Sequence, residues 1–443
     1  MTATGKTTPG SLSFDSLTQS LTFANASQET WWRKTGEMLA RVLHSADYSR
    51  EERQKYLRFH ADVLVPLLGP YPQRFHSSTT RSGLPLELSV NYRQYATKPP
   101  VVRIGFEPIG DLSGTEEDPF NRVPATKLVS MLAKLESIRN FNTQLGGQAI
   151  EDFTVNEAEE ASLQGTNIQG GYIKSQSAFG FDLVGDGEIL VEGYTFPALK
   201  CKVTGKPMGQ IMAEGVKKMR HLVDCSQAFS MVNAYLTETV YDERSFFSWD
   251  FVDPSKSRLK IYSSSNNVTW EKLAEVWTLG GRLDNPTRIK GLEYLRRLFD
   301  LINLSQQGER TVEVAFDNRK DSSKTTPLVW NYEMRPDNPT PLTKIYFPVH
   351  GENDMQVITS VAEFFRQIGM VALGGSYVAK VQSYYPEFDL RVTDRFTSWL
   401  SFAYTEKTGV YLSVYYHAST ENPWATEELI ARMTAQASCC REA

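Results

Sequence analysis

The chain has 443 residues, 41% of them hydrophobic and 12% aromatic, a composition typical of globular proteins. Its 47 Lys and Arg residues against 52 Asp and Glu residues give a net charge of −5, which excludes a general attraction to nucleic acid or to an anionic membrane, so an anion site would need a local cluster of cations. No run of about 18 apolar residues is present, and we expect a cytoplasmic protein with no nucleic-acid and no membrane partner.

The domain organisation is predicted from the length and from the polar ends of the chain. A closed barrel surrounded by helices can reach this length as one unit. We expect a disordered leader at 1–14, a single domain at 15–437 and a flexible tail at 438–443. The four cysteines, Cys201, Cys225, Cys439 and Cys440, lack the spacing of a disulfide framework or a zinc site and are predicted to be reduced thiols.

The first part of the chain predicts two helices, a pair of strands and a third helix. The first two helices end at Gly69-Pro70-Tyr71-Pro72, which cannot continue a helix. The strands are indicated by apolar residues alternating with polar ones. These elements span residues 29–45, 49–68, 85–92, 101–108 and 126–139.

The same pattern of two strands followed by helices then repeats four times. The predicted strand pairs are 174–184 with 188–199, 244–251 with 257–263, 328–334 with 343–350, and 398–405 with 410–417. The predicted helices are 210–239, 269–278, 287–304, 354–367 and 426–436. Hairpins that alternate with helices, without single parallel strands, predict an α+β fold with ten antiparallel strands as five hairpins, closed into a barrel inside a ring of helices.

The strand at 257–262 indicates what the barrel holds. Arg258, Lys260 and Tyr262 share one face, and Leu259 and Ile261 share the other. An apolar face suits packing under helices, so the cations and the phenol are predicted to face a polar lumen that binds an anion.

The second strands of the five hairpins resemble this one, and most place a charged residue two positions before an aromatic residue. Together they predict two bands in the lumen. The cationic band contains Arg103, Arg258, Lys260 and Lys344. The aromatic band contains Tyr194, Tyr262, Tyr346 and Tyr415.

These two bands suit the departure of a diphosphate from an allylic carbon. Buried cations need a counter-ion, and each charge-assisted hydrogen bond to a diphosphate contributes about 1.5–3 kcal/mol. The carbocation left behind is attracted to a ring face by about 2 kcal/mol when water is excluded. Glu87, a carboxylate on an inward face, is the candidate to accept a hydrogen bond from an indole N–H of the acceptor and to assist its deprotonation.

Each of these features also has a plainer interpretation. A strand with Arg and Lys is typical of a solvated sheet face, a single Glu of the surface, and tyrosines at strand ends of the rim of a core. The recurrence in five hairpins favours the lumen. The sequence has no acidic pair of the kind that clamps magnesium diphosphate, so we predict that the side-chain cations hold the diphosphate, that no metal site exists and that no cofactor is required.

Several motifs resemble those of the fungal indole prenyltransferases of the dimethylallyltryptophan synthase type, which have the ABBA barrel fold. The motifs are LLGPYP at 67–72, GLPLE at 83–87, RIGFEP at 103–108, DPFNR at 118–122, WTLGGR at 277–282, PVHGEND at 348–354 and SFAY at 401–404. Within this family the chain looks most similar to enzymes that prenylate tryptophan-containing cyclic dipeptides, in particular reverse prenyltransferases acting on cyclo-Trp-Pro (brevianamide F).

The resemblance implies roles for the residues named above. Glu87 matches the acidic residue that contacts the indole nitrogen, the four cations match diphosphate contacts, and the four tyrosines match a shield around the carbocation. Trp399, Phe196 and Leu86 are expected to line the acceptor pocket. Phe196 and Ser245 stand where enzymes that take free tryptophan have Tyr and Arg, which favours a blocked acceptor such as a diketopiperazine.

Glu192 departs from the family pattern, which usually has Lys at this position. A carboxylate at 4 Å from a diphosphate costs on the order of 4 kcal/mol at an effective dielectric constant near 20. Glu192 is neutralised by Lys344 or Arg258, points elsewhere, or weakens donor binding; our hypothesis is that it is paired.

The function predicted from the sequence is a dimethylallyltransferase that joins dimethylallyl diphosphate to the indole of a tryptophan-containing cyclic dipeptide in alkaloid biosynthesis. Three alternatives remain at this point. In the first alternative the acceptor is free tryptophan, and in the second it is another aromatic such as a phenol or a xanthone. In the third, the barrel is a non-catalytic carrier of hydrophobic anions.

Overall fold

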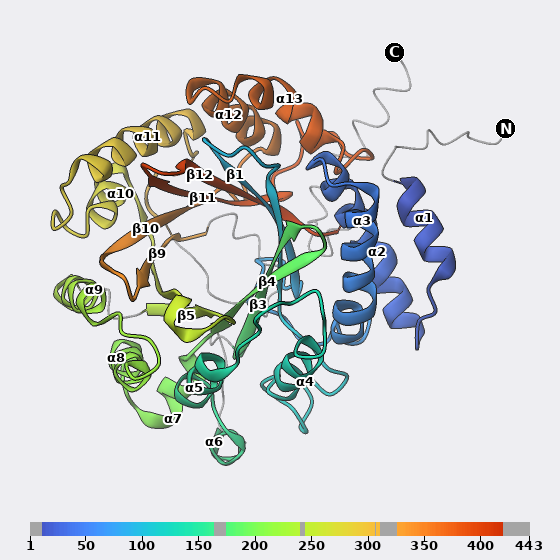
Figure 1. Cartoon of the computed structure of the whole chain (residues 1–443), viewed down its shortest axis with the longest axis horizontal. Coiled ribbons are helices and arrows are strands. Elements are labelled where there is room, and N and C mark those ends of the chain that lie inside the picture. Colours follow the sequence, from blue (N-terminus) through green and yellow to red (C-terminus); the bar gives the residue numbers. More distant parts are fainter. Residues whose placement is uncertain (1–10, 164–173, 240–243, 306, 311–325, 420–443) are drawn as a thin grey trace.

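A computed structural model of the chain describes residues 11–163, 174–239, 244–305, 307–310 and 326–419. Within these ranges ten antiparallel strands close into a barrel, in the order β1-β12-β11-β10-β9-β6-β5-β4-β3-β2, and helices surround it (Figure 1). The barrel strands are β1 (Leu86–Arg93), β2 (Val101–Phe106), β3 (Ser177–Gly185), β4 (Glu188–Thr195), β5 (Arg244–Asp250), β6 (Leu259–Ser265), β9 (Leu328–Arg335), β10 (Asn338–Pro348), β11 (Thr397–Thr405) and β12 (Gly409–His417). The predicted barrel of five hairpins is therefore confirmed.

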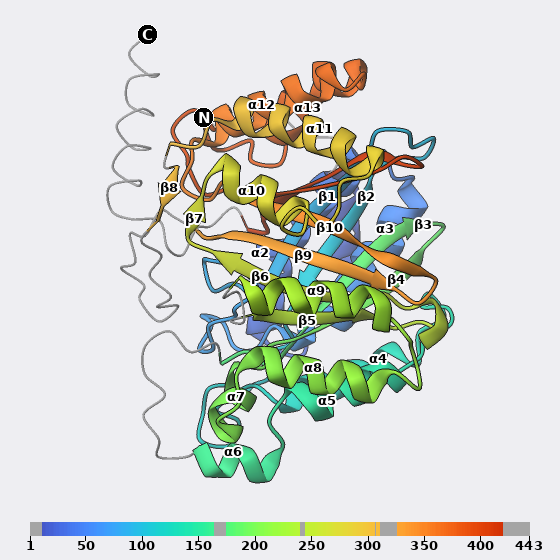
Figure 2. The ribbon, with the colours of Figure 1, turned by 90° about the vertical axis from the view of Figure 1, so that its left-hand side faces the viewer.

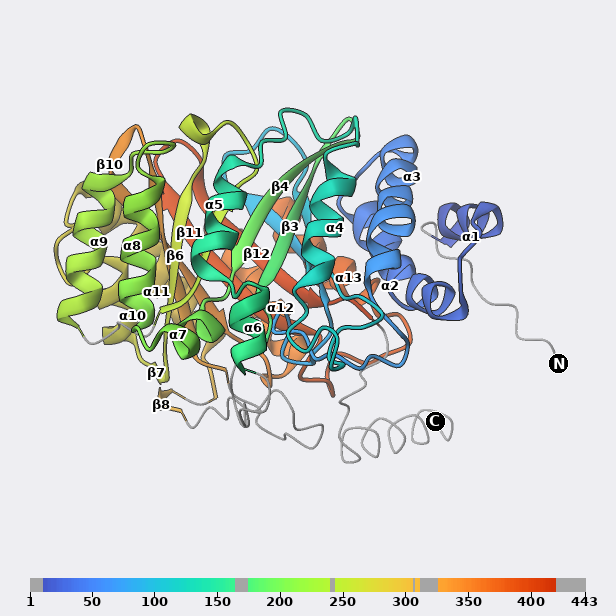
Figure 3. The same ribbon diagram turned by 90° about the horizontal axis from the view of Figure 1, so that it is seen from below.

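The helices form a single layer around most of the barrel, and α1 lies outside α2 and α3 (Figure 3). They are α1 (Ser11–Ser20), α2 (Ala26–Ser45), α3 (Arg50–Phe59), α4 (Val123–Leu132), α5 (Gln144–Phe153), α6 (Glu157–Leu163), α7 (Ala198–Thr204), α8 (Met208–Met219), α9 (Ser226–Glu238), α10 (Trp270–Trp277), α11 (Pro286–Ile302), α12 (Asp354–Gln367) and α13 (Val371–Gln382). Short helical turns at His60–Leu64, Val65–Leu67 and Pro254–Lys256 and a small pair of strands, β7 (Asn267–Val268) with β8 (Gly308–Glu309), complete the described elements (Figure 2). Among the described helices, none combines the length and apolar character that spanning a bilayer requires.

The alternation of apolar and polar residues along the strands places them on opposite faces of the barrel wall. Leu259 and Ile261 of β6 are fully buried in the core between strands and helices. Tyr332 of β9 has the same orientation, and its hydroxyl donates to the carbonyl of Val276 in α10 at 2.8 Å. The apolar face of each strand thus binds the helix ring, which leaves the polar face for the lumen.

Several predicted helix boundaries differ from the structure. The predicted helix 210–239 is two helices, α8 and α9, because the turn between them is held by Asp224, whose carboxylate accepts the Ser226 backbone N–H at 3.0 Å. Pro197 ends the extended segment, so residues 198–199 begin α7 instead of continuing a strand. The predicted helix 126–139 is shorter and lies at Val123–Leu132.

Five of the described helices were not predicted, namely α1, α5, α6, α7 and α13. Helices α5, α6 and α7 are short, and α13 contains Gly374 and Gly375, which lower helix propensity. Gly374 is required by packing, since a Cβ there would lie 2.6 Å from the carbonyl oxygen of Ala362 in α12. Helix α1 begins at Ser11, inside the predicted leader. The predicted helix at 426–436, the tail at 438–443 and two cysteines lie outside the described residues.

A buried carboxylate joins the end of β2 to two connecting segments. Glu107 accepts hydrogen bonds from Ser77 Oγ at 2.5 Å, Ser175 Oγ at 2.7 Å and Asn121 Nδ2 at 3.0 Å. Burial raises the pKa of Glu107 from 4.5 to about 7, although these three donors act in the opposite direction. The network holds segment 77–83, which returns the chain to β1 and forms part of the barrel mouth.

A substitution on the outward face of β6 tests how much the barrel depends on the helix ring. We expect Ile261→Ala to lower the free energy of unfolding by about 2–5 kcal/mol, because it leaves a cavity in a close-packed core. Ile289→Ala is the matched control, since Ile289 is 53% exposed on α11 and its loss should change stability by less than about 0.5 kcal/mol. Urea unfolding followed by circular dichroism measures both values, and equal values for the two variants would contradict the assignment of faces.

Glu107 predicts a pH dependence of stability. Because its pKa is higher in the folded chain than in the unfolded chain, the protonated form is favoured by folding, and stability is lost as the pH rises. Between pH 5 and pH 7 this loss amounts to about 2 kcal/mol. In Glu107→Gln the decline in unfolding free energy over this range should be smaller by that amount. Glu117→Gln, at an exposed carboxylate, should leave the decline as in the wild type; a decline unchanged in Glu107→Gln would refute the assignment.

Candidate functional site

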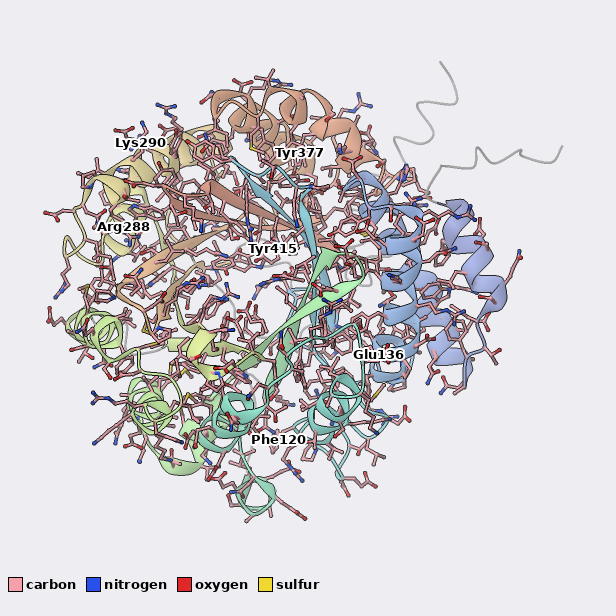
Figure 4. The ribbon with its side chains drawn as sticks, viewed as in Figure 1. Phe120, Glu136, Arg288, Lys290, Tyr377 and Tyr415 are labelled. Atoms are coloured by element: carbon pink, nitrogen blue, oxygen red, sulfur yellow. The ribbon has the colours of Figure 1, made fainter. Side chains whose placement is uncertain are left out.

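The barrel encloses a cavity of about 360 Å³, lined by inward-facing residues of the strands and by segment 78–81. Figure 4 shows the inner and outer sides of the barrel wall: Tyr415 lies near the centre of the barrel, whereas Tyr377 lies among the helices that surround the barrel. Three levels follow one another along the lumen. We call them the charged layer, the tyrosine layer and the Glu87 end, and define each below.

The tyrosine layer consists of the four predicted tyrosines and Phe246. The ring centroids of successive neighbours are 6.2 Å apart for Tyr194 and Tyr262, 6.0 Å for Tyr262 and Tyr346, and 6.1 Å for Tyr346 and Tyr415. The structure therefore brings all four together from different hairpins. Phe246 stacks on Tyr262 at 3.9 Å, which adds a fifth ring that the sequence analysis did not identify.

The charged layer contains four cations and four carboxylates that face the lumen. The cations are the predicted Arg103, Arg258, Lys260 and Lys344. The carboxylates are Asp182, Glu192, Asp250 and Glu333. Strands β3, β4, β5 and β9 supply these carboxylates, so the protein provides counter-ions of its own, and of these only Glu192 was expected from the sequence.

Each arginine of the charged layer has a carboxylate in fork geometry. Arg103 donates to Asp182 at 2.5 and 2.9 Å, and Arg258 donates to Asp250 at 2.7 and 2.6 Å. Glu333 lies 3.2 Å from Arg258. These pairs keep both guanidinium groups oriented in a buried site without a ligand.

Lys344 has a different environment from the arginines. Its nitrogen lies over the ring of Tyr411, 4.3 Å from the ring centroid, which provides a cation–π contact. Burial, followed by repulsion from Arg103, lowers the pKa of Lys344 to about 8. A bound anion would stabilise its charged form.

Glu192 is paired, as expected, but Arg258, one of the two predicted partners, is the most distant of its three cations. Its carboxylate lies 2.5 Å from Lys260, 3.1 Å from Arg103 and 3.8 Å from Arg258. Lys344 is not the partner. Burial acts to raise the pKa of Glu192, but these cations outweigh it and hold the pKa well below its usual value. Glu192 is therefore ionised in the free protein.

The Glu87 end lies on the other side of the tyrosine layer. Glu87 is buried and accepts a hydrogen bond from Ser398 Oγ at 2.7 Å. Burial raises its pKa to about 8, although this hydrogen bond acts in the opposite direction. Trp399, Phe196 and Ser245 also line the cavity, in agreement with their expected positions.

Leu86 does not line the cavity, so its predicted place in the acceptor pocket is wrong. Neighbouring residues of a strand point to opposite faces. Since Glu87 faces the lumen, Leu86 faces outward and belongs to the core under the helices.

The residues that sequence reasoning missed carried a partial signal. Asp182, Asp250 and Glu333 each occupy an inward position when their strand is read at period 2. Their partners depend on the register between strands, which places Arg103 opposite Asp182, its ion-pair partner. Ser398, the second residue of β11, lies far from Glu87 in the sequence, and no local pattern indicated their contact.

The arrangement can hold an anion beside a ring of aromatic faces, with a carboxylate of raised pKa at the far end of an enclosed cavity. In the described part of the chain, no cluster of three or more His, Cys, Asp or Glu side chains is arranged to hold a metal ion. The cations, the tyrosines and Glu87 come from five separate hairpins.

The chain is similar to known prenyltransferases over nearly its whole length. Prenyltransferase okaC from Penicillium ochrochloron is 60% identical, over 97% of this chain and 99% of that protein. Deoxybrevianamide E synthase notF from Aspergillus sp. (strain MF297-2) is 41% identical, over 91% of this chain and 90% of that protein.

Solved structures match in the same way. The crystal structure of NotF in complex with brevianamide F and DMSPP is 38% identical, with a TM-score of 0.83 over 92% of this chain and 99% of that chain. The crystal structure of AnaPT from Neosartorya fischeri is 26% identical, with a TM-score of 0.81 over 92% of this chain and 98% of that chain. The family model described as tryptophan dimethylallyltransferase matches residues 27–380. With its barrel, its inward tyrosines and these relatives, the chain belongs to the tryptophan dimethylallyltransferase family of prenyltransferases.

Proposed function

We propose that the protein transfers a dimethylallyl group from dimethylallyl diphosphate to the indole ring of a tryptophan-containing cyclic dipeptide such as cyclo-Trp-Pro. The observation that carries this proposal is a cavity lined by Arg103, by the four tyrosines and by Glu87. Arg258 and Lys260 lie beside Arg103, because all three contact Glu192. The relatives named above support the substrate pair, since notF is a deoxybrevianamide E synthase and NotF was solved with brevianamide F and DMSPP.

The charged layer receives the diphosphate of the donor. Arg103, Arg258, Lys260 and Lys344 offer N–H donors at one level, and Arg103 also reaches the tyrosine layer, where its Nη1 lies 3.3 Å from the hydroxyl of Tyr194. Heterolysis breaks the bond between the allylic carbon and the diphosphate oxygen, and the diphosphate keeps the electron pair. Side-chain cations stabilise this leaving group, and we propose that the reaction needs no metal ion.

The tyrosine layer surrounds the allyl cation. Its rings lie about 6 Å from one another and present faces or edges to the space that the dimethylallyl group would fill. The electron-rich faces stabilise a cation, and their packing keeps water from adding to it. The layer thus directs the cation to a carbon nucleophile instead of hydrolysis.

Glu87 acts on the acceptor. An ionised Glu87 accepts a hydrogen bond from the indole N–H, which raises the electron density of the ring as the new carbon–carbon bond forms. The alkylated ring then gives a proton to Glu87, which returns it to solvent. Phe196 and Ser245 provide a ring and a hydroxyl at this end of the cavity, which supports a neutral acceptor such as a diketopiperazine.

The activity is tested directly by mass spectrometry of a reaction between the purified protein, dimethylallyl diphosphate and cyclo-Trp-Pro. We expect a product heavier than the acceptor by one dimethylallyl group in place of a hydrogen, together with one diphosphate per product.

The rate should be unchanged in EDTA, because the charged layer binds the donor through side chains. Loss of activity in EDTA with recovery on adding magnesium would contradict metal independence. Turnover of phenols, xanthones or free tryptophan but not of cyclo-Trp-Pro would contradict the assigned acceptor, and donor binding without turnover of any acceptor would indicate a carrier.

The role of Glu87 predicts a pH profile and a separation of binding from turnover. In the wild type, kcat/KM for the acceptor should rise with pH up to about 8, because the carboxylate must be ionised to act as a base. Glu87→Gln should lower kcat by about 10²-fold or more and abolish this rise. Donor affinity, measured by calorimetry, should stay within about twofold, since Glu87 lies beyond the tyrosine layer from the cations. A variant with kcat within tenfold of the wild type would refute the role.

A further inference from the structure

Glu192 is the most enclosed carboxylate of the charged layer. Its side chain is 3% exposed, compared with 21% for Asp182 and 13% for Asp250. Oε1 accepts hydrogen bonds from Lys260 Nζ at 2.5 Å and from Ser248 Oγ at 3.0 Å. Oε2 accepts no hydrogen bond from the described part of the chain, although Arg103 lies 3.1 Å away. Oε2 therefore has ion-pair contacts with Arg103 and Arg258 but an unused hydrogen-bonding position.

The charged layer is nearly neutral before any ligand enters. It contains four cations and four carboxylates, and a fifth cation, Arg335, reaches Glu333 from the rim at 2.8 Å with its side chain 48% exposed. Each phosphate group of a diphosphate ester carries at least one negative charge at neutral pH. A bound donor would thus leave this enclosed site with a large negative charge unless positive charge enters with it, and a buried excess charge is unfavourable.

Glu192 is the carboxylate of this layer whose counter-ions the donor would take. Asp182 and Asp250 are each held by two hydrogen bonds from one arginine, and Glu333 keeps Arg335 at the rim. Glu192 instead shares Lys260 and the outer edges of Arg103 and Arg258, all three of which point toward the proposed diphosphate. Once these cations turn to the phosphate oxygens, Glu192 faces an anion in a buried site.

We propose that Glu192 takes up one proton from solvent when the donor binds, and that the resulting carboxylic acid donates a hydrogen bond to an oxygen of the diphosphate. This inference rests on the proposed function, because the diphosphate supplies the charge that drives the protonation. The charged groups that face Glu192 are the cations Arg103, Arg258, Lys260 and Lys344 and the carboxylates Asp182, Asp250 and Glu333. The hydroxyls of Tyr194, Tyr262 and Tyr346 also interact electrostatically with Glu192.

The protonation is balanced over one turnover. When the carbon–oxygen bond of the donor breaks, the diphosphate keeps the electron pair, and the hydrogen bond from Glu192 stabilises the additional charge on it. The proton leaves with the diphosphate product or returns to solvent, and Glu192 then pairs with Lys260 again. Glu192 is in this account a catalytic residue, since it touches the leaving group.

Isothermal titration calorimetry with the thiolodiphosphate analogue of the donor, DMSPP, measures the proton uptake. The titration is carried out at pH 7 in EDTA, in phosphate and in Tris, since the two buffers differ in their heat of ionisation and the difference in binding heat reports the protons taken up. We expect the wild type to take up close to one proton more per analogue bound than Glu192→Gln. Over pH 6–8 its affinity should weaken by up to tenfold more per pH unit than that of the variant.

Glu333→Gln is the matched control, because it makes the same substitution in the same layer. It should keep the proton uptake of the wild type even if its affinity changes. Equal uptake in the wild type and Glu192→Gln would overturn the inference, as would a loss of uptake in Glu333→Gln instead. Thermal unfolding checks that each variant folds. If Glu192→Gln does not fold, the wild type is compared with Lys344→Arg, because Lys344 is the other group of this layer whose protonation the donor would favour. No net uptake in the wild type, or an uptake that disappears in Lys344→Arg, would then overturn the inference. Failure of the analogue to bind the wild type at all would instead refute the proposed function and this inference with it.

Discussion

The structure depends on pairing charges inside a closed barrel. Removing an ion from water costs several kcal/mol unless a partner and further hydrogen bonds compensate. In this protein Arg103 of β2, and Arg258 and Lys260 at β6, meet carboxylates of neighbouring strands. Asp182 holds Arg103 in a fork, and Asp250 holds Arg258 in the same way. The charged layer can therefore exist before the ligand arrives, and its donors are already oriented toward the lumen.

The same pairing limits how a donor anion can bind. A layer of free cations would bind diphosphate by charge alone, whereas this layer must exchange internal partners for external ones. Lys344, which lies over the ring of Tyr411, can bind the donor with little loss of existing contacts. Lys260 must first break its ion pair with Glu192. The layer thus favours a ligand that offers several oxygens at once, since one oxygen could not replace all of these contacts.

The three levels separate tasks that would interfere with one another in a smaller space. Glu87 has a raised pKa because it is buried away from the cations, whereas Glu192 has a lowered pKa because it lies among them. Two carboxylates in one lumen thereby acquire opposite properties from their surroundings. In the proposed mechanism the tyrosine layer surrounds the allyl cation, and the two carboxylates act on different substrates.

The sequence by itself determined the barrel and the orientation of most lumen residues, because period-2 alternation is a local property and recurred in five hairpins. It placed Arg103, Lys260 and Tyr262 inward for that reason, and it indicated Glu87 by the same parity. It did not determine α13, whose glycines are explained only by contact with α12. Leu86 was wrongly expected in the acceptor pocket, although the same alternation points it away from the lumen when Glu87 faces inward. The tertiary structure alone decided which charges meet: Glu192 pairs with Lys260, and Glu87 meets Ser398, because strand register and barrel closure bring together residues that are 68 and 311 positions apart.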